Sequence, residues 1–339
     1  MKIALLGGSF DPVHEGHIQM AKEAVAQLDV EEVWFLPTWK TPLKERNLSS
    51  TNDRVQMLEL ALASYPKFKI NLVEMERMGS SYTIDTLSIL CQRYPENQFY
   101  WLMGNDQLEQ FDRWKEPEKL VKLAQFVCFD RLGKLAKPSY PILCLHMPMM
   151  PVSSSEIRKG YKLNYLDPNV LNYIYQHRLY IENFVRERVN PHRFAHSLSV
   201  ASLCEELAIS HHLDSHKAYL IGLFHDIAKS MSKEKMEPWM DAICPENKIY
   251  PVPVWHGFVG SEIVKRVFGL WDETICAAIY HHVLGTSTDP YAMIVFCADK
   301  LDPLRGYPVQ EQIEQTKKDL EKGFSLVKEE NKKYLEGKE

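Results

Sequence analysis

The chain has 339 residues, more than one domain usually holds, so two domains are the better expectation. A hydrophobic fraction of 45% is typical of a globular protein, and a net charge of −5 argues against nonspecific binding to nucleic acid or to a membrane surface. The first apolar run ends at Gly7, and the seven cysteines form no Cys-x-x-Cys pair. These features predict a cytoplasmic protein with free thiols and with neither nucleic-acid nor membrane partners.

Strand-like and helix-like patterns alternate through the first half of the chain. Six short apolar runs are expected to form strands, at residues 2–6, 33–37, 68–73, 98–103, 126–129 and 142–145. Apolar residues recur at helical spacing between them, notably at 18–28, 53–65 and 83–94. This alternation predicts a doubly wound α/β domain with a parallel, Rossmann-like sheet and helices on both faces. Ligands bind such sheets at the carboxyl ends of the strands.

The stretch after the first strand, residues 7–17, reads GGSFDPVHEGH. It forms a strand end, a tight glycine turn and the start of a helix, where unpaired backbone N–H groups can receive an anion. Gly7 and Gly8 allow the backbone to approach a ligand closely. His14 and His17 lie three residues apart, so both can face one point above the turn. Two imidazoles at a helix N-terminus suit a polyphosphate whose negative charge rises in a transition state.

Four further loops in this half carry side chains suited to a nucleotide. Lys44 lies on a proline-stiffened loop after the second strand, from which a lysine can reach a phosphate. The string SYTIDT at residues 81–86 opens a helix, and Gly104-Asn105-Asp106 follows the fourth strand. The last string, MMPVSSSEIR at 149–158, brings hydroxyls and an arginine to another helix start, which predicts a second anion clamp.

These strings resemble, in order, the motifs of the nicotinate mononucleotide adenylyltransferases, a family of nucleotidylyltransferases. The resemblance covers residues 1–182 and implies adenylyl transfer from ATP, with Mg²⁺, to nicotinate mononucleotide. The products are nicotinate adenine dinucleotide and pyrophosphate, a step of NAD biosynthesis. Leu43 replaces the histidine that the family has before Lys44. Other nucleotidylyltransferases, such as phosphopantetheine or cytidylyl transferases, are the alternative. The string SYTIDT argues against them, as does Trp114, which follows Gly104-Asn105-Asp106 as a tryptophan does in the family.

The site residues of this domain follow from the resemblance. The catalytic residues are expected to be His14, His17, Lys44 and Arg158. The ATP-binding residues are expected to be Gly7, Gly8, Ser9, Phe10, His14, His17, Gly104, Asp106, Ser154, Ser155 and Arg158. The mononucleotide-binding residues are expected to be Lys44, Tyr82, Thr83, Thr86 and Trp114. Trp114 would stack on the pyridine ring, although a tryptophan of the core is the competing interpretation.

The second half begins at a polar stretch, residues 182–190, so the domains are expected at 1–182 and 183–339. Beyond this stretch the strand pattern fades and helical spacing recurs, at 197–209, 217–229, 259–267, 273–283 and 291–300. Residues 310–335 are expected to form a charged, exposed tail helix. The pattern therefore predicts an all-α domain.

Polar residues interrupt three of these apolar helices. His225-Asp226, His281-His282 and Asp299 each break or end an apolar run. Burying an unpaired carboxylate is costly, and a bound metal ion removes that cost. One such residue is more often a hydrogen-bonded core residue, but three breaks on three helices predict a metal site.

This half resembles the HD phosphohydrolase superfamily, and most closely its diadenosine tetraphosphatases, over residues 190–307. The match to the His…His-Asp…Asp pattern and to the extra ligands of two-metal members implies the metal ligands His196, His225, Asp226, His256, His282 and Asp299. Either histidine of the pair at 281–282 could take the last histidine position, and His282 is preferred.

The resemblance implies a catalytic Asp226 that bridges two metal ions, with Lys229 and Arg305 as outer phosphate clamps. Mixed imidazole and carboxylate ligands suit iron, manganese or zinc, and the spacing does not choose among them. The implied reaction is symmetric cleavage of diadenosine tetraphosphate into two ADP. A nucleotide phosphatase with another substrate and a non-catalytic nucleotide-binding regulator are the alternatives.

Overall fold

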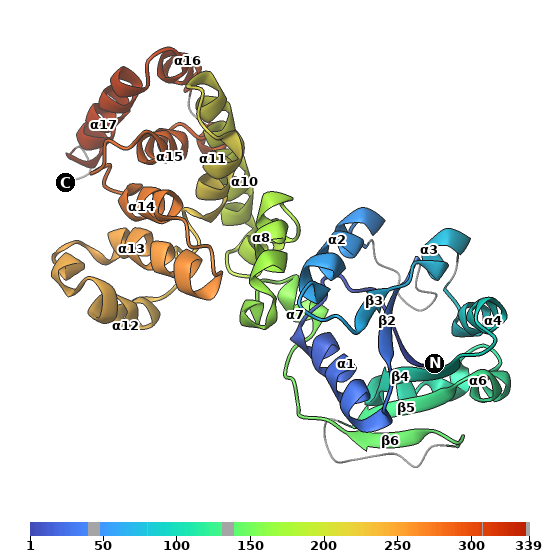
Figure 1. The fold of residues 1–339 in the computed structure, drawn as a ribbon. Helices are drawn as coiled ribbons and strands as arrows, with labels where there is room; N and C mark the ends of the chain where they lie inside the picture. The colour runs from blue at the N-terminus through green and yellow to red at the C-terminus, as the bar shows by residue number, and fades with distance from the viewer. Residues whose placement is uncertain (40–47, 80, 131–138, 307, 337–339) are drawn as a thin grey trace. The chain divides into compact units, whose positions relative to one another are not determined.

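The computed structural model describes residues 1–39, 48–79, 81–130, 139–306 and 308–336. It divides into two compact units, Met1–Ile174 and Tyr175–Glu339, which follow one another along the chain (Figure 1). The division falls within helix α8 (Pro168–Gln176), before the boundary expected at residue 182. Tyr175 belongs to the second unit because its buried hydroxyl donates to the Phe268 carbonyl oxygen at 2.7 Å. None of the described helices combines the length and the apolar character needed to cross a membrane.

A six-stranded parallel sheet forms the centre of the first unit. Its strands are β1 (Lys2–Gly8), β2 (Glu32–Pro37), β3 (Phe68–Ile70), β4 (Gln98–Gly104), β5 (Gln125–Asp130) and β6 (Leu143–His146). The strand order is β3-β2-β1-β4-β5-β6, which confirms the doubly wound α/β prediction. The order reverses between β1 and β4, so the carboxyl ends of these two strands flank the place where such sheets bind ligands.

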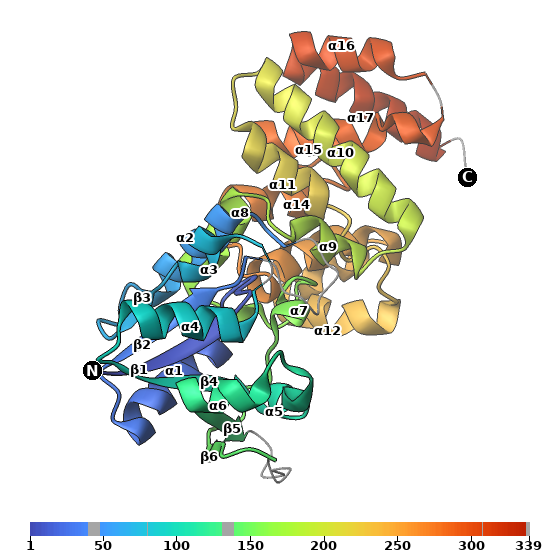
Figure 2. The ribbon, with the colours of Figure 1, turned by 90° about the vertical axis from the view of Figure 1, so that its right-hand side faces the viewer.

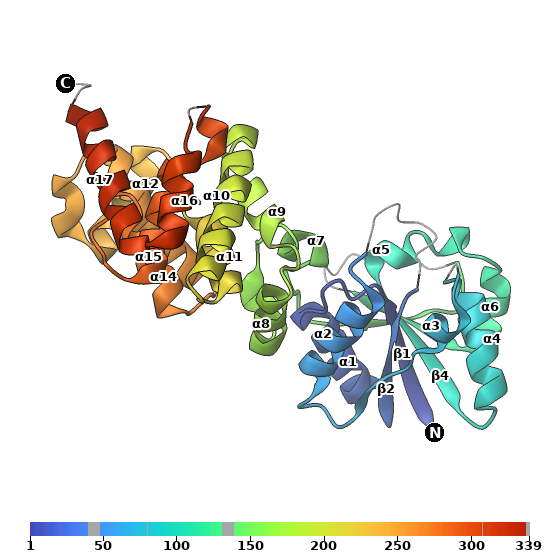
Figure 3. The ribbon, with the colours of Figure 1, turned by 90° about the horizontal axis from the view of Figure 1, so that it is seen from above.

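Helices cover both faces of this sheet (Figure 3). One face carries α1 (Glu15–Leu28) and α2 (Thr51–Leu62), and the other carries α3 (Val73–Arg77), α4 (Thr83–Arg93) and α6 (Pro117–Leu123). Alternate strand residues such as Leu5, Trp101 and Phe126 pack against the second group of helices. The short helix α5 (Asn105–Leu108) follows β4 directly, and α7 (Ser154–Ile157) follows the loop after β6. The central strands β1, β2, β4 and β5 are therefore largely buried on both sides, as a parallel sheet requires, whereas the edge strand β6 is partly exposed.

The second unit is helical in its described elements, which confirms the all-α prediction. Its central helices are α10 (Pro191–Ser210), α11 (Ser215–Phe224), α14 (Glu273–His281) and α15 (Pro290–Lys300), with α9 (Ile181–Arg186), α12 (Lys233–Ile243) and α13 (Trp255–Glu262) packed around them. Some elements differ from the expectation. Helices α9 and α12 were not predicted, and α11 ends at Phe224 rather than continuing to Lys229.

The C-terminal segment forms a packed helical pair instead of the expected exposed tail helix. Helices α16 (Gln310–Lys318) and α17 (Leu320–Glu336) are separated at Asp319, whose backbone is extended. They lie beside α10 and α15 (Figure 2). The ring of Phe324 meets that of Phe296 of α15 at a centroid distance of 5.2 Å. The expectation was wrong because a stripe of apolar residues on these helices is buried against the domain.

Candidate functional sites

The loop after β1 holds two histidine rings at the start of α1. His14 is the N-cap residue, and its Nδ1 accepts a hydrogen bond from the Gly16 N–H at 3.2 Å. Nδ1 of His17 accepts from the His14 N–H at 3.2 Å, and the two rings lie 3.8 Å apart between centroids. Because both Nδ1 atoms accept, each neutral ring carries its proton on Nε2. Both histidines are therefore fixed as Nε2–H donors, which suit phosphate oxygens.

The glycines before these histidines have a packing role. A Cβ on Gly7 would lie 2.9 Å from Cζ2 of Trp101, and a Cβ on Gly8 would lie 3.1 Å from Cζ of Phe10. Phe10 is itself fully buried, with its ring edge-on to His17 at 5.1 Å. The neighbouring rings therefore require a glycine at position 7 independently of any ligand, a reason that the sequence analysis did not foresee.

Helix α7 is tied to the same loop through residues expected to bind ATP. Ser154 Oγ donates to the Pro12 carbonyl oxygen at 2.9 Å. Arg158 donates from Nη1 to the Asp11 carbonyl oxygen at 2.7 Å and from Nη2 to Ser155 Oγ at 3.0 Å. The structure thus brings the second predicted anion clamp to the first, across more than 140 residues of sequence.

Arg54 holds the loop as well, although the sequence analysis did not single it out. Its side chain is buried, and Nη1 donates to the carbonyl oxygens of Ser9 at 3.0 Å and Thr38 at 2.8 Å. The sequence could not predict this role of Arg54, because the carbonyl oxygens that accept its hydrogen bonds belong to residues distant along the chain.

The loop after β4 lies at the same sheet edge. Leu6 of β1 is in register with Leu102 of β4, so the two glycines of the turn and Gly104 lie together at the carboxyl ends of these paired strands. Gly104 is buried at the start of α5, and Asp106 is exposed. The predicted ATP-binding residues of the described chain therefore gather at the carboxyl ends of β1 and β4. Lys44 lies outside the described residues.

The SYTIDT element differs in part from the expectation. Tyr82 is exposed and Thr83 begins α4, but Thr86 is fully buried. The Thr86 hydroxyl donates to Oε1 of Glu74 at 2.8 Å, so its side chain supports the loop from inside and does not face a ligand. Burial raises the pKa of Glu74, although hydrogen bonds from Ser81 and Thr86 oppose the shift. Glu74 is a further residue that the sequence analysis missed, because α3 is too short to show a periodicity.

Trp114 packs against the core of the first unit without being fully buried. The indole packs against the core, with its centroid 5.3 Å from that of Phe111 and 6.3 Å from that of Phe126. It nevertheless remains partly exposed. One aromatic surface is therefore anchored in the core beside the SYTIDT helix, which packs on the same cluster.

In the second unit, the six predicted metal ligands come together in what we call the histidine–aspartate cluster. Its members are His196 of α10, His225 and Asp226 after α11, His256 of α13, His282 at the end of α14, and Asp299 of α15. The helices approach closely at Gly222, where a Cβ would lie 2.7 Å from Cα of Ala201. His281 lies outside the cluster, and its Nδ1 is 2.7 Å from Thr286 Oγ1.

Each carboxylate of the cluster is bracketed by imidazole nitrogens. Oδ1 of Asp226 lies 3.0 Å from His256 Nε2 and 3.7 Å from His282 Nε2. Oδ1 of Asp299 lies 3.2 Å from His196 Nε2 and 3.9 Å from His225 Nε2. Two groups of three ligand atoms are each compact enough for one metal ion, namely His196, His225 and Asp299, and His225, Asp226 and His282. His225 is common to both groups.

The second ring nitrogen of three of these histidines is hydrogen-bonded to the backbone. The Nδ1 atoms of His225, His256 and His282 lie 2.7, 2.7 and 2.6 Å from the carbonyl oxygens of Gly222, Pro253 and Ile279. A carbonyl only accepts, so Nδ1 carries the proton and Nε2 of the neutral ring offers a lone pair. Burial lowers the pKa of His225 to about 4 and also lowers the pKa of His256 and His282, which keeps these rings neutral near pH 7.

This arrangement places nitrogen lone pairs against carboxylates in a buried site. Among the described residues, Nε2 of His225 and of His282 are buried and have no hydrogen-bond partner. Lone pairs that converge in this way repel one another unless a cation lies between them. The donor set of imidazole nitrogens and carboxylate oxygens is one that iron, manganese and zinc accept.

His196 is oriented by a residue that the sequence analysis missed. Its Nδ1 lies 2.5 Å from Oδ2 of the buried Asp302, whose Oδ1 accepts from Ser199 Oγ at 2.6 Å. Burial opposes a charge on His196, but Asp299 and Asp302 outweigh burial and raise its pKa to about 9. The only signal in the sequence was a second aspartate three residues after Asp299.

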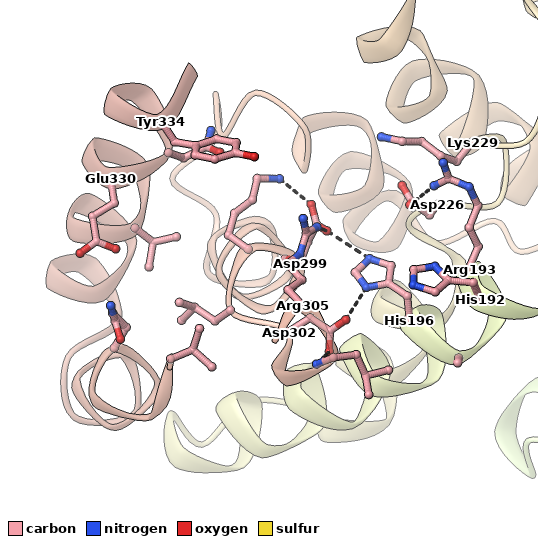
Figure 4. A pocket seen from close by; sticks show the side chains of 18 of the residues that line it. His192, Arg193, His196, Asp226, Lys229, Asp299, Asp302, Arg305, Glu330 and Tyr334 are labelled. Atoms are coloured by element: carbon pink, nitrogen blue, oxygen red, sulfur yellow. Dashed lines mark hydrogen bonds and ion pairs between the residues drawn. The ribbon is translucent and has the colours of Figure 1, made fainter. Parts of the chain in front are cut away.

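A cavity of about 1390 Å³ opens over the cluster (Figure 4). Cationic side chains surround its carboxylates. Lys300 Nζ lies 2.5 Å from Asp299 Oδ2, Arg305 Nη2 lies 2.7 Å from Asp299 Oδ1, and Arg193 Nη1 lies 3.5 Å from Asp226 Oδ2. Lys229 lies 3.1 Å from His256 Nε2, and burial lowers its pKa. Cations around a cavity of this size suit a polyphosphate ligand.

Comparisons with known proteins agree with this division. The chain matches a cytidylyltransferase-like family over residues 5–160 and the HD domain over residues 193–304. A Mycoplasma pneumoniae protein named "Probable nicotinate-nucleotide adenylyltransferase/Ap4A hydrolase" is 29% identical over 95% of this chain and 97% of its own length. The Bacillus subtilis nicotinate-nucleotide adenylyltransferase is 41% identical over 53% of this chain and 98% of its own length.

Among solved structures, a Plasmodium falciparum nicotinic acid mononucleotide adenylyltransferase complexed with NaAD has a TM-score of 0.46 and 24% identity, over 53% of this chain and 97% of that one. The resemblances seen in the sequence are confirmed by the two family matches and by the curated relatives. The chain belongs to the nicotinate-nucleotide adenylyltransferase family, and an HD domain is fused to its C-terminal side.

Proposed function

We propose that the first unit transfers the adenylyl group of ATP to nicotinate mononucleotide and that the HD domain hydrolyses diadenosine tetraphosphate to two ADP. The meeting of His14, His17 and Arg158 at the carboxyl end of β1 supports the first activity. The buried histidine–aspartate cluster beneath a cation-lined cavity supports the second.

In the adenylyl transfer, a phosphate oxygen of the mononucleotide attacks the α-phosphorus of ATP in line, and the bond to pyrophosphate breaks. Direct in-line transfer of this kind needs only positioning of the reactants and neutralisation of the phosphate charge, so no covalent intermediate is proposed. The Nε2–H groups of His14 and His17 would donate to phosphate oxygens as their charge grows, beside the N–H groups at the start of α1. Mg²⁺ bound with ATP would neutralise further phosphate charge.

Trp114 provides a test of mononucleotide recognition. Replacing Trp114 by alanine should raise the KM for nicotinate mononucleotide about tenfold, the order expected for a lost aromatic stack, and change the KM for ATP far less. Trp114→Phe keeps an aromatic ring and should lie between the wild type and the alanine variant. Steady-state kinetics with each substrate varied in turn measure both constants. Equal changes in the KM values for the two substrates, or loss of the native circular dichroism spectrum, would indicate that Trp114 has only a structural role.

In the HD domain, the cluster fits two metal ions, because orphaned Nε2 lone pairs and carboxylate oxygens converge there. Such metals supply a water of lowered pKa as nucleophile and hold the reacting phosphates. Asp302 fixes the ring of His196, and the backbone carbonyls fix the other three rings, so the ligands are set before the metals bind. Arg193, Lys229 and Arg305 line the same cavity and would hold the phosphate chain.

The hydrolysis breaks the central phosphoanhydride bond. A water oxygen forms a bond to one of the two middle phosphorus atoms, the bridging oxygen leaves with the other half, and both products are ADP. The intact ligand set favours a catalytic domain over a regulator that only binds nucleotides. Another nucleotide substrate for the same chemistry is the second candidate.

Product analysis with the whole protein tests both activities. With ATP, nicotinate mononucleotide and Mg²⁺, the expected products are nicotinate adenine dinucleotide and pyrophosphate. With iron or manganese and diadenosine tetraphosphate, the expected product is ADP alone, without ATP or AMP. Asymmetric products would overturn the proposed cleavage site. If the metal-loaded protein cleaves no nucleotide in a broad panel, the hydrolase proposal is wrong and a regulatory domain takes its place.

A further inference from the structure

Helix α17 supplies one wall of the cavity above the histidine–aspartate cluster. Four residues on one face of this helix line the cavity, at the spacing of successive helical turns: Val327, Glu330, Asn331 and Tyr334. None of them was considered in the sequence analysis. The wall that they form, which we call the α17 wall, belongs to a segment expected to be an exposed tail.

The α17 wall is fixed to the domain by its own packing. Phe324 packs on Phe296, and Lys328 Nζ donates to the Gly285 carbonyl oxygen at 2.7 Å. A Cβ on Gly323 would lie 2.4 Å from Thr316 Oγ1, so glycine permits the close contact between α16 and α17. These contacts fix the first half of α17 to the domain, and the same helix continues through Tyr334.

The chemistry of the cavity changes from the cluster to the α17 wall. Cations and metal ligands occupy the region of α10, the turn after α11 and the end of α15. Two large apolar side chains, Tyr334 with 61% and Leu304 with 60% of their surface exposed, line the same cavity. Figure 4 shows Tyr334 across the cavity from His192 and Arg193. Exposed apolar groups inside a cleft usually mark ligand contacts. A ligand that fits both regions has a polyanionic part and a flat apolar part.

We propose that the α17 wall is a purine subsite, in which Tyr334 stacks on one base of the substrate and the Asn331 carboxamide pairs with its edge. This inference rests on the proposed hydrolase function and names how that site selects its substrate. Aromatic stacking suits any base, whereas a carboxamide can donate to N7 and accept from the N6 amine of adenine. Glu330 on the same face is an acceptor only, so it adds a further contact to an exocyclic amine.

The first experiment compares hydrolysis of diadenosine tetraphosphate by the wild type and by Tyr334→Ala. The KM should rise about tenfold or more, the order for loss of one base stack, with kcat changed less than twofold. Tyr334→Phe keeps the ring and should restore the wild-type KM. The neighbouring Lys333→Ala removes an exposed side chain of α17 that does not line the cavity, and it should behave as the wild type. Inhibition by inorganic tripolyphosphate, which has no base, should be equal in all four proteins.

Asn331 tests the edge contact separately. Asn331→Ala should narrow the preference for diadenosine over diguanosine tetraphosphate, measured as the ratio of kcat/KM values. Tyr334→Ala should lower both values together, because stacking does not distinguish the two purines. An unchanged preference in Asn331→Ala would overturn the assignment of Asn331.

The two proposals fail in different ways. If the wild type cleaves diadenosine tetraphosphate and Tyr334→Ala has the same KM, the subsite is wrong and the hydrolase function stands. If the wild type cleaves no nucleotide, the function is wrong, and calorimetric binding of ADP to the manganese-loaded protein still decides the subsite. Tyr334→Ala should then bind ADP about tenfold more weakly and tripolyphosphate equally well. Equal ADP affinity, or an equal loss for both ligands, would overturn it.

Discussion

Replacing Asp226 by alanine is expected to abolish metal binding and hydrolysis by the HD domain, while adenylyl transfer survives. Asp226 has the central position among the predicted ligands, with Oδ1 at 3.0 Å from His256 Nε2 and 3.7 Å from His282 Nε2. Its loss removes one ligand of a compact group of three and leaves the neighbouring lone pairs without a shared cation. We therefore expect hydrolysis to fall below detection rather than to slow by a small factor.

Metal content by elemental analysis and ADP release from diadenosine tetraphosphate measure this prediction. Asp226→Asn keeps the size of the side chain and removes its charge, so it separates ligation from packing and should fail in the same way. Asp241→Ala, an exposed aspartate of α12 paired with Lys248, is the matched control and should keep both metal and activity. A fully metallated and active Asp226→Ala protein would contradict the assignment of the cluster. Loss of adenylyl transfer together with hydrolysis would contradict the independence of the two activities.

Replacing His17 by alanine is expected to lower kcat for adenylyl transfer by about two to four orders of magnitude, the range for a lost preorganised donor. The His17 ring is fixed by the His14 N–H on one side and by the edge of Phe10 on another, so its donor needs no reorganisation during the reaction. An interaction that strengthens as the phosphate charge develops acts on kcat more than on KM.

The second unit provides an internal control for this variant, because His17→Ala should leave hydrolysis of diadenosine tetraphosphate intact. His146→Ala removes an exposed histidine of β6 in the same unit and should keep the wild-type kcat. Initial rates of pyrophosphate release at saturating ATP and mononucleotide give kcat directly. A near-normal kcat in a folded His17→Ala protein would show that His17 has no catalytic role in adenylyl transfer.

The sequence by itself determined the fold class of both domains and both family assignments. The central strands β1, β2, β4 and β5 are mostly apolar runs that are largely buried on both faces, and such a strand can be predicted from the sequence without knowledge of its neighbours. The GGSFDPVHEGH turn is likewise local, because its glycines, cap residue and histidines lie within eleven residues. Part of the predicted ligand set was indicated for a related reason, since the polar residues His225-Asp226, His282 and Asp299 interrupt or end apolar helices. His196 and His256 were predicted from the resemblance alone.

The reliance on local patterns also explains why two segments were predicted wrongly. The apolar run of α11 continues past Phe224, but the chain turns there and carries His225 and Asp226 into the cluster. The tail from residue 310 has many charges, which outweigh its apolar stripe in a sequence average although the stripe is buried against α15. In both cases the structure of the segment depends on the residues that pack against it, and a local sequence pattern does not identify those residues.

Only the tertiary structure decided which residues support the sites. Asp302 orients His196 from 106 positions away, Glu74 holds Thr86 from a different helix, and Arg54 fastens the glycine loop through carbonyl oxygens of other segments. Tyr334 reaches the cavity because α17 folds back onto the domain. No sequence motif or periodic pattern distinguishes these side chains from others of the same type. Their roles arise from burial and from hydrogen-bond partners distant along the chain, and those partners exist only once the domains have packed.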